Sequence, residues 1–88
     1  MFRKKFYKGI ALLISMHHYE LAEQQLLGSL CPNEDSIFSL QYLRILYRAS
    51  GAVEDELRYE QRLRPCLLAE TEEAVALGAH LLEQGVFV

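Results

Sequence analysis

The chain has 88 residues, enough for one small domain, and its net charge at pH 7 is −3. About half of the residues are apolar and 24% are charged, with two prolines and five glycines, a globular composition that suits helices. The acidic balance argues against a nucleic-acid-binding protein, because such a protein needs a broad basic face. No apolar run approaches the ~20 residues that a membrane-spanning helix requires, so no integral membrane segment is expected.

The first predicted helix covers about residues 3–15. Its apolar side chains recur at steps of three and four residues and form one stripe, made by Phe2, Phe6, Ile10 and Leu13. The basic residues between them imitate the start of a signal peptide, but no small-residue cleavage site follows, which favours an amphipathic helix in a cytoplasmic protein. This basic start forms either a solvated face or a contact with an acidic partner or an anionic membrane surface.

A tight turn at residues 16–18 leads to the second predicted helix, over about residues 19–30. Pro32 ends this helix, because proline cannot continue the helical hydrogen bonds and disfavours helix in the residue before it. The third helix then begins at Asp35 or Ser36, because a short side-chain oxygen satisfies the free amides of a helix start.

Gly51 is predicted to end the third helix, since glycine readily adopts the left-handed backbone of a helix terminus. The fourth helix covers about residues 53–64, with acidic side chains in its first turn and arginines in its last, and Pro65 is predicted to interrupt it. Thr71 opens a fifth helix that continues to about residue 84. No strand is predicted, so the fold class is all-α.

A spacing of 34 residues recurs along the chain. Gly51 and Gly85 are 34 residues apart, as are Leu43 and Leu77, and His17 precedes Gly51 by the same interval. A fixed period of this length predicts antiparallel helix pairs stacked as a short, degenerate solenoid of about five helices, whereas a helical bundle with a chance period is the alternative. The prediction is a single domain over residues 1–88, with approximate repeats at 3–34, 36–69 and an incomplete 71–88.

Residues 74–87 resemble the first helix and turn of a tetratricopeptide repeat, with Leu77 and Gly78 followed by Leu81 and by a turn at Gly85. In such a repeat the glycines permit close approach and turning, and the large apolar residues fill the space between paired helices. The same frame is matched by Leu40, Leu43, Tyr47, Gly51 and Val53.

The chain departs from the repeat pattern at several positions. His17 stands in place of a turn glycine, and Glu56 and Glu60 occupy second-helix positions that should be apolar. Either the fourth helix is rotated, or these two carboxylates face solvent.

The resemblance implies that the first helix of each repeat lines a concave groove. Carried over onto this chain, the implied partner-binding residues are Tyr7, Ala11, Ile14, Phe38, Gln41, Ile45, Arg48, Val75, Ala79 and Leu82. The lysines and asparagines with which some relatives grip a C-terminal carboxylate are absent, and a mostly apolar groove suits the nonpolar face of an amphipathic helix. The alternative is that these side chains pack on one another as core.

The chain is similar in size, helical content and acidic charge to the tetratricopeptide-like co-chaperones of type III secretion needle subunits (the YscG type). This resemblance implies that the groove holds an amphipathic helix of a secreted filament subunit and keeps it unpolymerised, while a second small helical chaperone packs alongside. The leading hypothesis is therefore a protein-binding chaperone or adaptor, and the alternative is a structural subunit that oligomerises or scaffolds a larger complex. The last helix has apolar sides and no mate, so it is covered by the chain's own tail or, as we favour, by a partner.

No constellation of residues predicts catalysis, a cofactor or a metal, and an enzyme is not expected. His17 and His18 are adjacent, so they project in different directions, and no third ligand has a matching spacing. His80 is interpreted as a packed or half-exposed helix residue rather than a catalytic base. Cys31 and Cys66 are interpreted as buried thiols rather than a disulfide.

Overall fold

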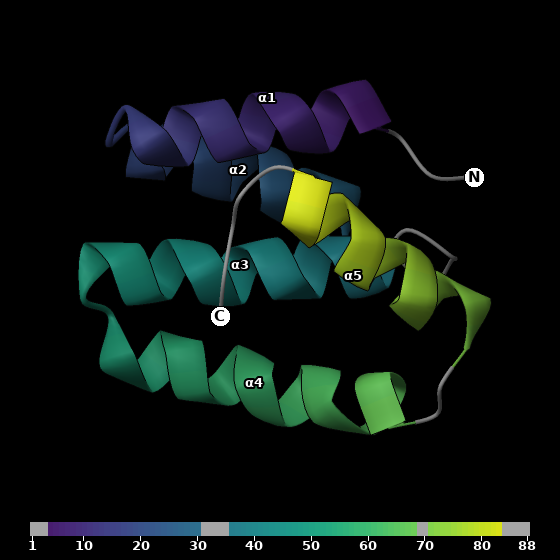
Figure 1. Ribbon diagram of the computed structural model, residues 1–88. Helices are drawn as coiled ribbons and strands as arrows, with labels where there is room; N and C mark the ends of the chain where they lie inside the picture. Colours follow the sequence, from purple (N-terminus) through teal and green to yellow (C-terminus); the bar gives the residue numbers. More distant parts are fainter. Residues whose placement is uncertain (1–3, 31–35, 69–70, 84–88) are drawn as a thin grey trace.

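The computed structural model describes residues 4–30, 36–68 and 71–83, which form five α-helices and no strand. The helices are α1 (Lys4–Ser15), α2 (Tyr19–Ser29), α3 (Ser36–Ser50), α4 (Val53–Leu68) and α5 (Glu72–Glu83). Figure 1 shows α3 and α4 side by side and antiparallel, with α1 and α2 along the other side of α3 and with α5 crossing in front of α3 at an angle. The predicted all-α class is confirmed.

Helix α3 is the centre of the fold. It packs against α1, α2, α4 and α5, and α1 also packs against α2. In a regular stack of repeats the fifth helix would contact both helices of the preceding pair, yet no substantial contact joins α5 to α4 among the described residues. The stacked-solenoid arrangement therefore stays a prediction.

The turns after α1 and α3 share one geometry, and they lie 34 residues apart in the chain. His17 has φ 65° and Gly51 has φ 82°, and the amide that follows each of them donates to a carbonyl five residues earlier, at 2.9 and 2.8 Å. Each turn thus closes over the end of its helix through a left-handed residue. The predicted role of Gly51 is confirmed, and His17 adopts the same backbone at a cost of roughly 1–2 kcal/mol because it has a Cβ.

Helix α4 continues past the residue at which the sequence predicted an interruption. Pro65 lies within the helix, which ends at Leu68. Pro65 cannot donate to the carbonyl of Gln61, but Gln61 is exposed, so water can satisfy that carbonyl. The predicted break at Pro65 is therefore wrong: a proline in the last turn removes one replaceable hydrogen bond without ending the helix.

The start of α5 follows its predicted cap. The hydroxyl oxygen of Thr71 accepts a hydrogen bond from the amide of Ala74 at 3.2 Å, which satisfies one of the free amides of the first turn. The other predicted end signals, Pro32, Asp35 and Gly85, lie outside the described residues.

The core lies around α3. Its buried apolar side chains are Tyr7, Ile10, Ala22, Leu26, Ile37, Phe38, Leu40, Tyr42, Leu43, Leu46, Tyr47, Tyr59, Leu63 and Leu77. Tyr47 connects three helices, since its hydroxyl donates to Glu23 of α2 at 2.6 Å and its ring stacks on Tyr59 of α4 with centroids 5.6 Å apart. Burial, and then the hydrogen bond to Glu23, raise the pKa of Tyr47 well above its ordinary value.

Candidate partner-binding surface

Three of the ten predicted partner-binding residues are buried. Tyr7, Phe38 and Gln41 expose 0%, 2% and 3% of their surface. The rings of Tyr7 and Phe38 lie 5.3 Å apart, and the ring of His80 from α5 approaches them to 6.4 and 5.9 Å. Helix α5 thus lies over this part of the expected groove. Tyr7 and Phe38 therefore pack in the core, as the alternative interpretation of the sequence predicted, and do not line an open groove.

Polar contacts hold α5 on this aromatic cluster. The Tyr42 hydroxyl and the His80 Nε2 are hydrogen-bonded at 2.7 Å, and the Tyr42 ring stacks on Tyr7 at 5.5 Å. The Tyr7 hydroxyl in turn hydrogen-bonds Ser39 at 2.8 Å. Burial, and to a lesser degree the neighbouring Tyr7, raise the pKa of Tyr42 to about 12. His80 is 3% exposed, which confirms its interpretation as a packed residue.

Three more of the predicted residues are half-buried. Ala11 and Ile14 on α1 and Ile45 on α3 pack against the edge of the core. They neither fill the centre nor form a free surface, so they carry little weight in defining a binding face.

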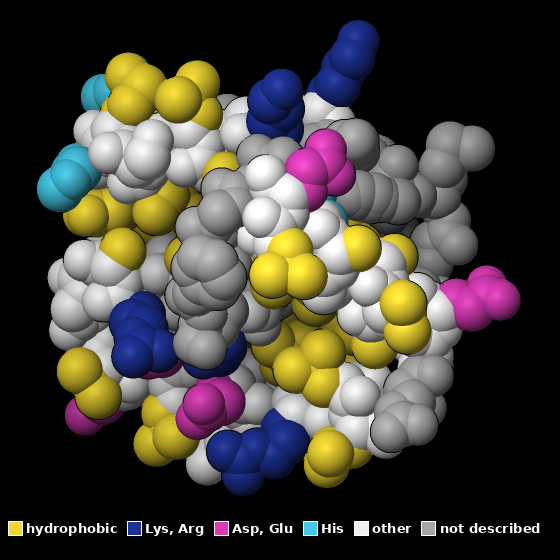
Figure 2. All heavy atoms as spheres, viewed as in Figure 1, with side chains coloured by type: hydrophobic (Ala, Val, Ile, Leu, Met, Phe, Trp, Pro, Cys, Tyr) yellow, Lys and Arg dark blue, Asp and Glu magenta, His cyan; other side chains and the backbone are white. Residues whose placement is uncertain are grey.

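The remaining apolar residues of the predicted set lie together on one side of α5. Val75 and Leu82 expose 70% and 69% of their surface, and Ala79 between them is also exposed. Their spacing of four and three residues places them on the same face, which we call the outer face of α5. Figure 2 shows hydrophobic side chains over α5 and in the recess between α5 and α4. The opposite side of α5 packs through Leu77 and His80, so the helix is apolar on both sides.

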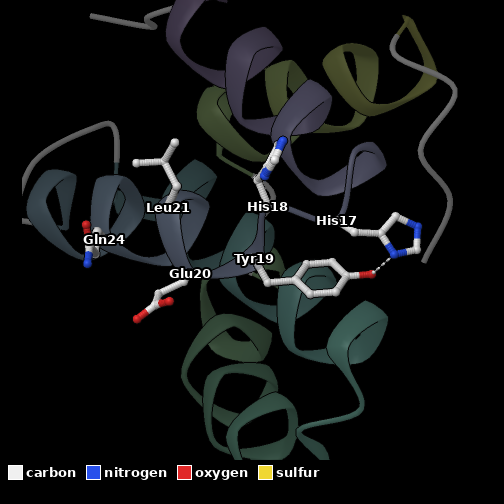
Figure 3. A pocket seen from close by; sticks show the side chains of 6 residues that line it. All are labelled: His17, His18, Tyr19, Glu20, Leu21 and Gln24. Carbon is white, nitrogen blue, oxygen red and sulfur yellow. Dashed lines mark hydrogen bonds between the residues drawn. The ribbon is translucent and has the colours of Figure 1, made fainter.

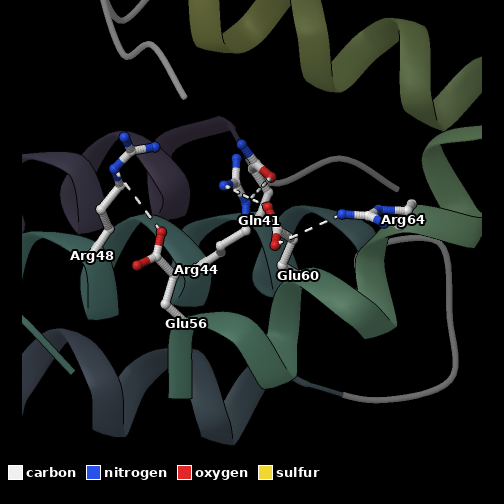
Figure 4. Close-up of polar contacts among 6 residues, drawn as sticks. All are labelled: Gln41, Arg44, Arg48, Glu56, Glu60 and Arg64. Carbon is white, nitrogen blue, oxygen red and sulfur yellow. Dashed lines mark hydrogen bonds and ion pairs between the residues drawn. The ribbon is translucent and has the colours of Figure 1, made fainter. Parts of the chain in front are cut away.

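The last predicted residue, Arg48, borders a hollow of about 380 Å³ between α3 and α4. This arginine hollow is lined by Arg44, Arg48, Glu60, Leu63, Arg64 and Leu67. Figure 4 shows its charged side chains pointing toward one another across the two helices. Sequence reasoning did not identify Arg44 and Arg64 as parts of a site.

The ion pairs in the arginine hollow are long. Arg44 and Arg64 lie 3.8 Å from the carboxylate of Glu60, and Arg48 lies 3.9 Å from that of Glu56. The Arg44 Nε also donates to the side-chain oxygen of Gln41 at 3.4 Å. Glu56 and Glu60 therefore face arginines of α3 with side chains 23% and 39% exposed, so the two carboxylates are partly solvated and partly paired. Their i, i+4 spacing, matched by that of Arg44 and Arg48, is the signal that could have revealed the hollow.

Arg44 is the buried member of this group, with 9% of its surface exposed. Burial lowers the pKa of Arg44, although Glu60 and Glu56 oppose the shift. The guanidinium stays charged at neutral pH, so the hollow holds a poorly solvated cation.

A second hollow, of about 400 Å³, adjoins the turn between α1 and α2. Figure 3 shows its lining residues, among which His17 points toward Tyr19 while His18 points in another direction. The Nδ1 of His17 and the hydroxyl of Tyr19 are hydrogen-bonded at 3.3 Å. Within the described part of the chain, no three histidine, cysteine or acidic residues are placed to hold a metal ion.

Cys66 is a free and exposed thiol, so its predicted burial is wrong, and Cys31 lies outside the described residues.

Of the helices that the structure describes, none combines the length and the apolar character needed to cross a membrane. Comparisons with protein-family models, curated proteins and solved structures found no match for this chain.

Proposed function

We propose that this chain is a protein-binding module that holds an amphipathic helix of a partner against the outer face of α5. The observation that carries the proposal is that α5 is apolar on two sides and that, among the described residues, it packs through only one of them. Leu77 is 1% exposed, whereas Val75 and Leu82 are about 70% exposed. A helix with apolar side chains on two opposite sides is normally covered on both of them, so the open side favours a partner.

The chemistry of this face fits the nonpolar stripe of another helix. Val75, Ala79 and Leu82 extend over two helical turns, and their small-to-medium side chains allow close helix–helix contact. Covering a valine- or leucine-sized side chain contributes roughly 1.5–3 kcal/mol before the costs of ordering the complex. Val75 and Leu82 together therefore contribute roughly 3–6 kcal/mol, which is comparable with the cost of association, so further contacts must add to them in a reversible complex.

For the partner class, we propose a filament-forming subunit of the type III secretion kind, accompanied by a second small helical chaperone. The resemblance in the sequence, the small all-helical fold and the exposed apolar face support this choice. By covering the apolar stripe of the subunit, the module would keep it soluble and unpolymerised in the cytoplasm through mass action. The proposed role is binding and not catalysis.

A pair of matched double variants tests the proposal. Val75→Asp with Leu82→Asp places two charges on the outer face of α5, whereas Val53→Asp with Leu57→Asp makes the same change on exposed residues of α4. Each protein is co-expressed with a needle-type filament subunit, and the recovered complex is quantified after affinity purification. We expect the α5 variant to lose about a hundredfold or more in affinity and the α4 variant to bind normally.

Circular dichroism and light scattering complete the experiment. Both variants should remain helical, so that lost binding is not lost folding. Equal binding by the two variants would contradict the proposal. If the protein alone forms a stable oligomer that only the α5 variant dissociates, the outer face joins copies of this chain, and the structural-subunit alternative is correct.

A further inference from the structure

We infer that the arginine hollow between α3 and α4 is a carboxylate-binding subsite that receives an acidic side chain of the helical partner. The inference rests on the proposed function and adds the chemistry of the partner. Phe38 contacts His80 of α5, and Gln41 and Arg48 follow Phe38 at three and ten residues along α3. With about 3.6 residues per turn, Gln41 and Arg48 lie within about a quarter turn of Phe38, so Arg48 places one edge of the hollow next to the side of α3 that carries α5.

The charge of the hollow favours an anion. Three arginines (Arg44, Arg48 and Arg64) face two glutamates, which leaves one positive charge in excess on a chain whose net charge is −3. Figure 2 shows basic and acidic side chains next to one another on this face of the molecule. An acidic side chain of a partner would complete the pairing, because it supplies the negative charge that the hollow lacks.

The donors of the hollow are only partly used. Its arginine–glutamate distances of 3.8–3.9 Å exceed the roughly 2.7–3.2 Å of an N–H···O hydrogen bond. By contrast, Arg58 and Asp55, which lie one turn apart on α4, approach to 3.3 Å. The guanidinium groups of the hollow therefore keep N–H donors for a further carboxylate, which arginine binds through two parallel hydrogen bonds.

The burial of Arg44 gives a physical reason for a partner carboxylate. A buried charge is costly unless it is paired at close range, and the nearest described carboxylate oxygen to Arg44 lies 3.8 Å away. A carboxylate that enters the hollow would bring the pairing to hydrogen-bond distance. The Arg44 guanidinium is already ordered by Gln41, so it loses little freedom on binding.

The walls of the hollow select the kind of anion. Leu63 is 1% exposed and Leu67 is 40% exposed, so the arginines are flanked by apolar surface that suits the methylene groups of a glutamate. Glu56 and Glu60 would repel a polyanion such as a nucleic acid, because several phosphates would meet two carboxylates. A single acidic residue within an otherwise apolar stripe is the ligand that fits.

The test uses two fluorescent amphipathic helical peptides. Both carry the same leucine stripe, interrupted by one glutamate in one peptide and by one glutamine at the same position in the other. Binding is followed by anisotropy at low and at high salt. We expect the glutamate peptide to bind the native protein about tenfold more tightly at low salt, and we expect this preference to shrink at high salt.

Two protein variants test whether the preference for the glutamate peptide arises at the arginine hollow. Arg48→Gln with Arg64→Gln removes two exposed arginines of the hollow without disturbing the buried Arg44, and Arg58→Gln with Arg62→Gln makes the same charge change on other arginines of α4. We expect only the first variant to lose the preference for the glutamate peptide.

The outcomes separate the two proposals. If both peptides bind equally to every protein form, the carboxylate subsite is overturned while the helix-binding function stands. A preference that survives Arg48→Gln with Arg64→Gln overturns the subsite as well, since it would arise from general charge. If neither peptide binds, the proposed function fails, and this inference fails with it.

Discussion

Helices α3 and α5 have similar shares of apolar residues but opposite environments. Of the residues whose burial the structure describes, ten are buried on α3, whereas Leu77 and His80 are the buried ones on α5 and Val75 and Leu82 are about 70% exposed. The difference arises from position, because α3 contacts four other helices and α5 packs chiefly on α3. The same kind of sequence thus forms a core in one place and a candidate binding surface in another, and composition alone does not distinguish them.

The largest expected effect compares one leucine from each helix. Leu43→Ala should lower the free energy of unfolding by about 2–5 kcal/mol, because it opens a cavity at a residue with no exposed surface. Leu82→Ala should change it by less than about 0.5 kcal/mol, because Leu82 is 69% exposed. Urea denaturation followed by circular dichroism measures both. Equal losses would show that the outer face of α5 is covered in the isolated protein.

Hydrogen exchange tests whether α5 opens independently of α3. We expect the amides of α5 to be protected at least about a hundredfold less than those in the middle of α3, because α5 is attached through few buried side chains. Tyr42→Phe, which removes the hydrogen bond to His80, should increase exchange in α5 more than in α3. Uniform protection across both helices would contradict this division.

High pH should weaken the attachment of α5 to α3 through Tyr42. The folded-state pKa of Tyr42 is raised to about 12, so its stabilising contribution is complete below the ordinary value near 10 and is lost as the pH rises from 10 toward 12. The free energy of unfolding should fall by about 1.4 kcal/mol per pH unit in this window for each such tyrosine. The Tyr42→Phe variant should show a shallower slope than the native protein in urea titrations from pH 9 to 11.5.

The smallest expected effect concerns the turn that ends α3, compared with its equivalent after α1. Gly51→Ala should cost about 1 kcal/mol, because an alanine is strained at φ 82°. His17→Gly should have the opposite sign, with a gain of up to about 1 kcal/mol, because it relieves the same strain at φ 65°. Thermal unfolding of the two variants measures both changes in stability. A lower stability of the His17→Gly variant would indicate that the contact between His17 and Tyr19 outweighs the backbone strain.

The candidate site was only partly predictable. The outer face of α5 could be anticipated, since Val75, Ala79 and Leu82 share one side of a predicted helix. Tyr7 and Phe38 were predicted to line an open groove, but they lie beneath α5. The sequence could not show this, because periodicity defines the face of a helix and not the neighbour that covers it.

The helices, the left-handed turn at Gly51 and the cap at Thr71 could be predicted from local sequence, apart from the continuation of α4 beyond Pro65. These features depend on interactions within one or two helical turns, so local spacing and residue type decide them. The crossing of α5 over α3 and the pairing of Glu56 and Glu60 with the arginines of the hollow emerge from the packed fold and not from local sequence. Those arrangements depend on contacts between residues far apart in the chain, where packing and charge pairing choose among faces that the sequence leaves equivalent.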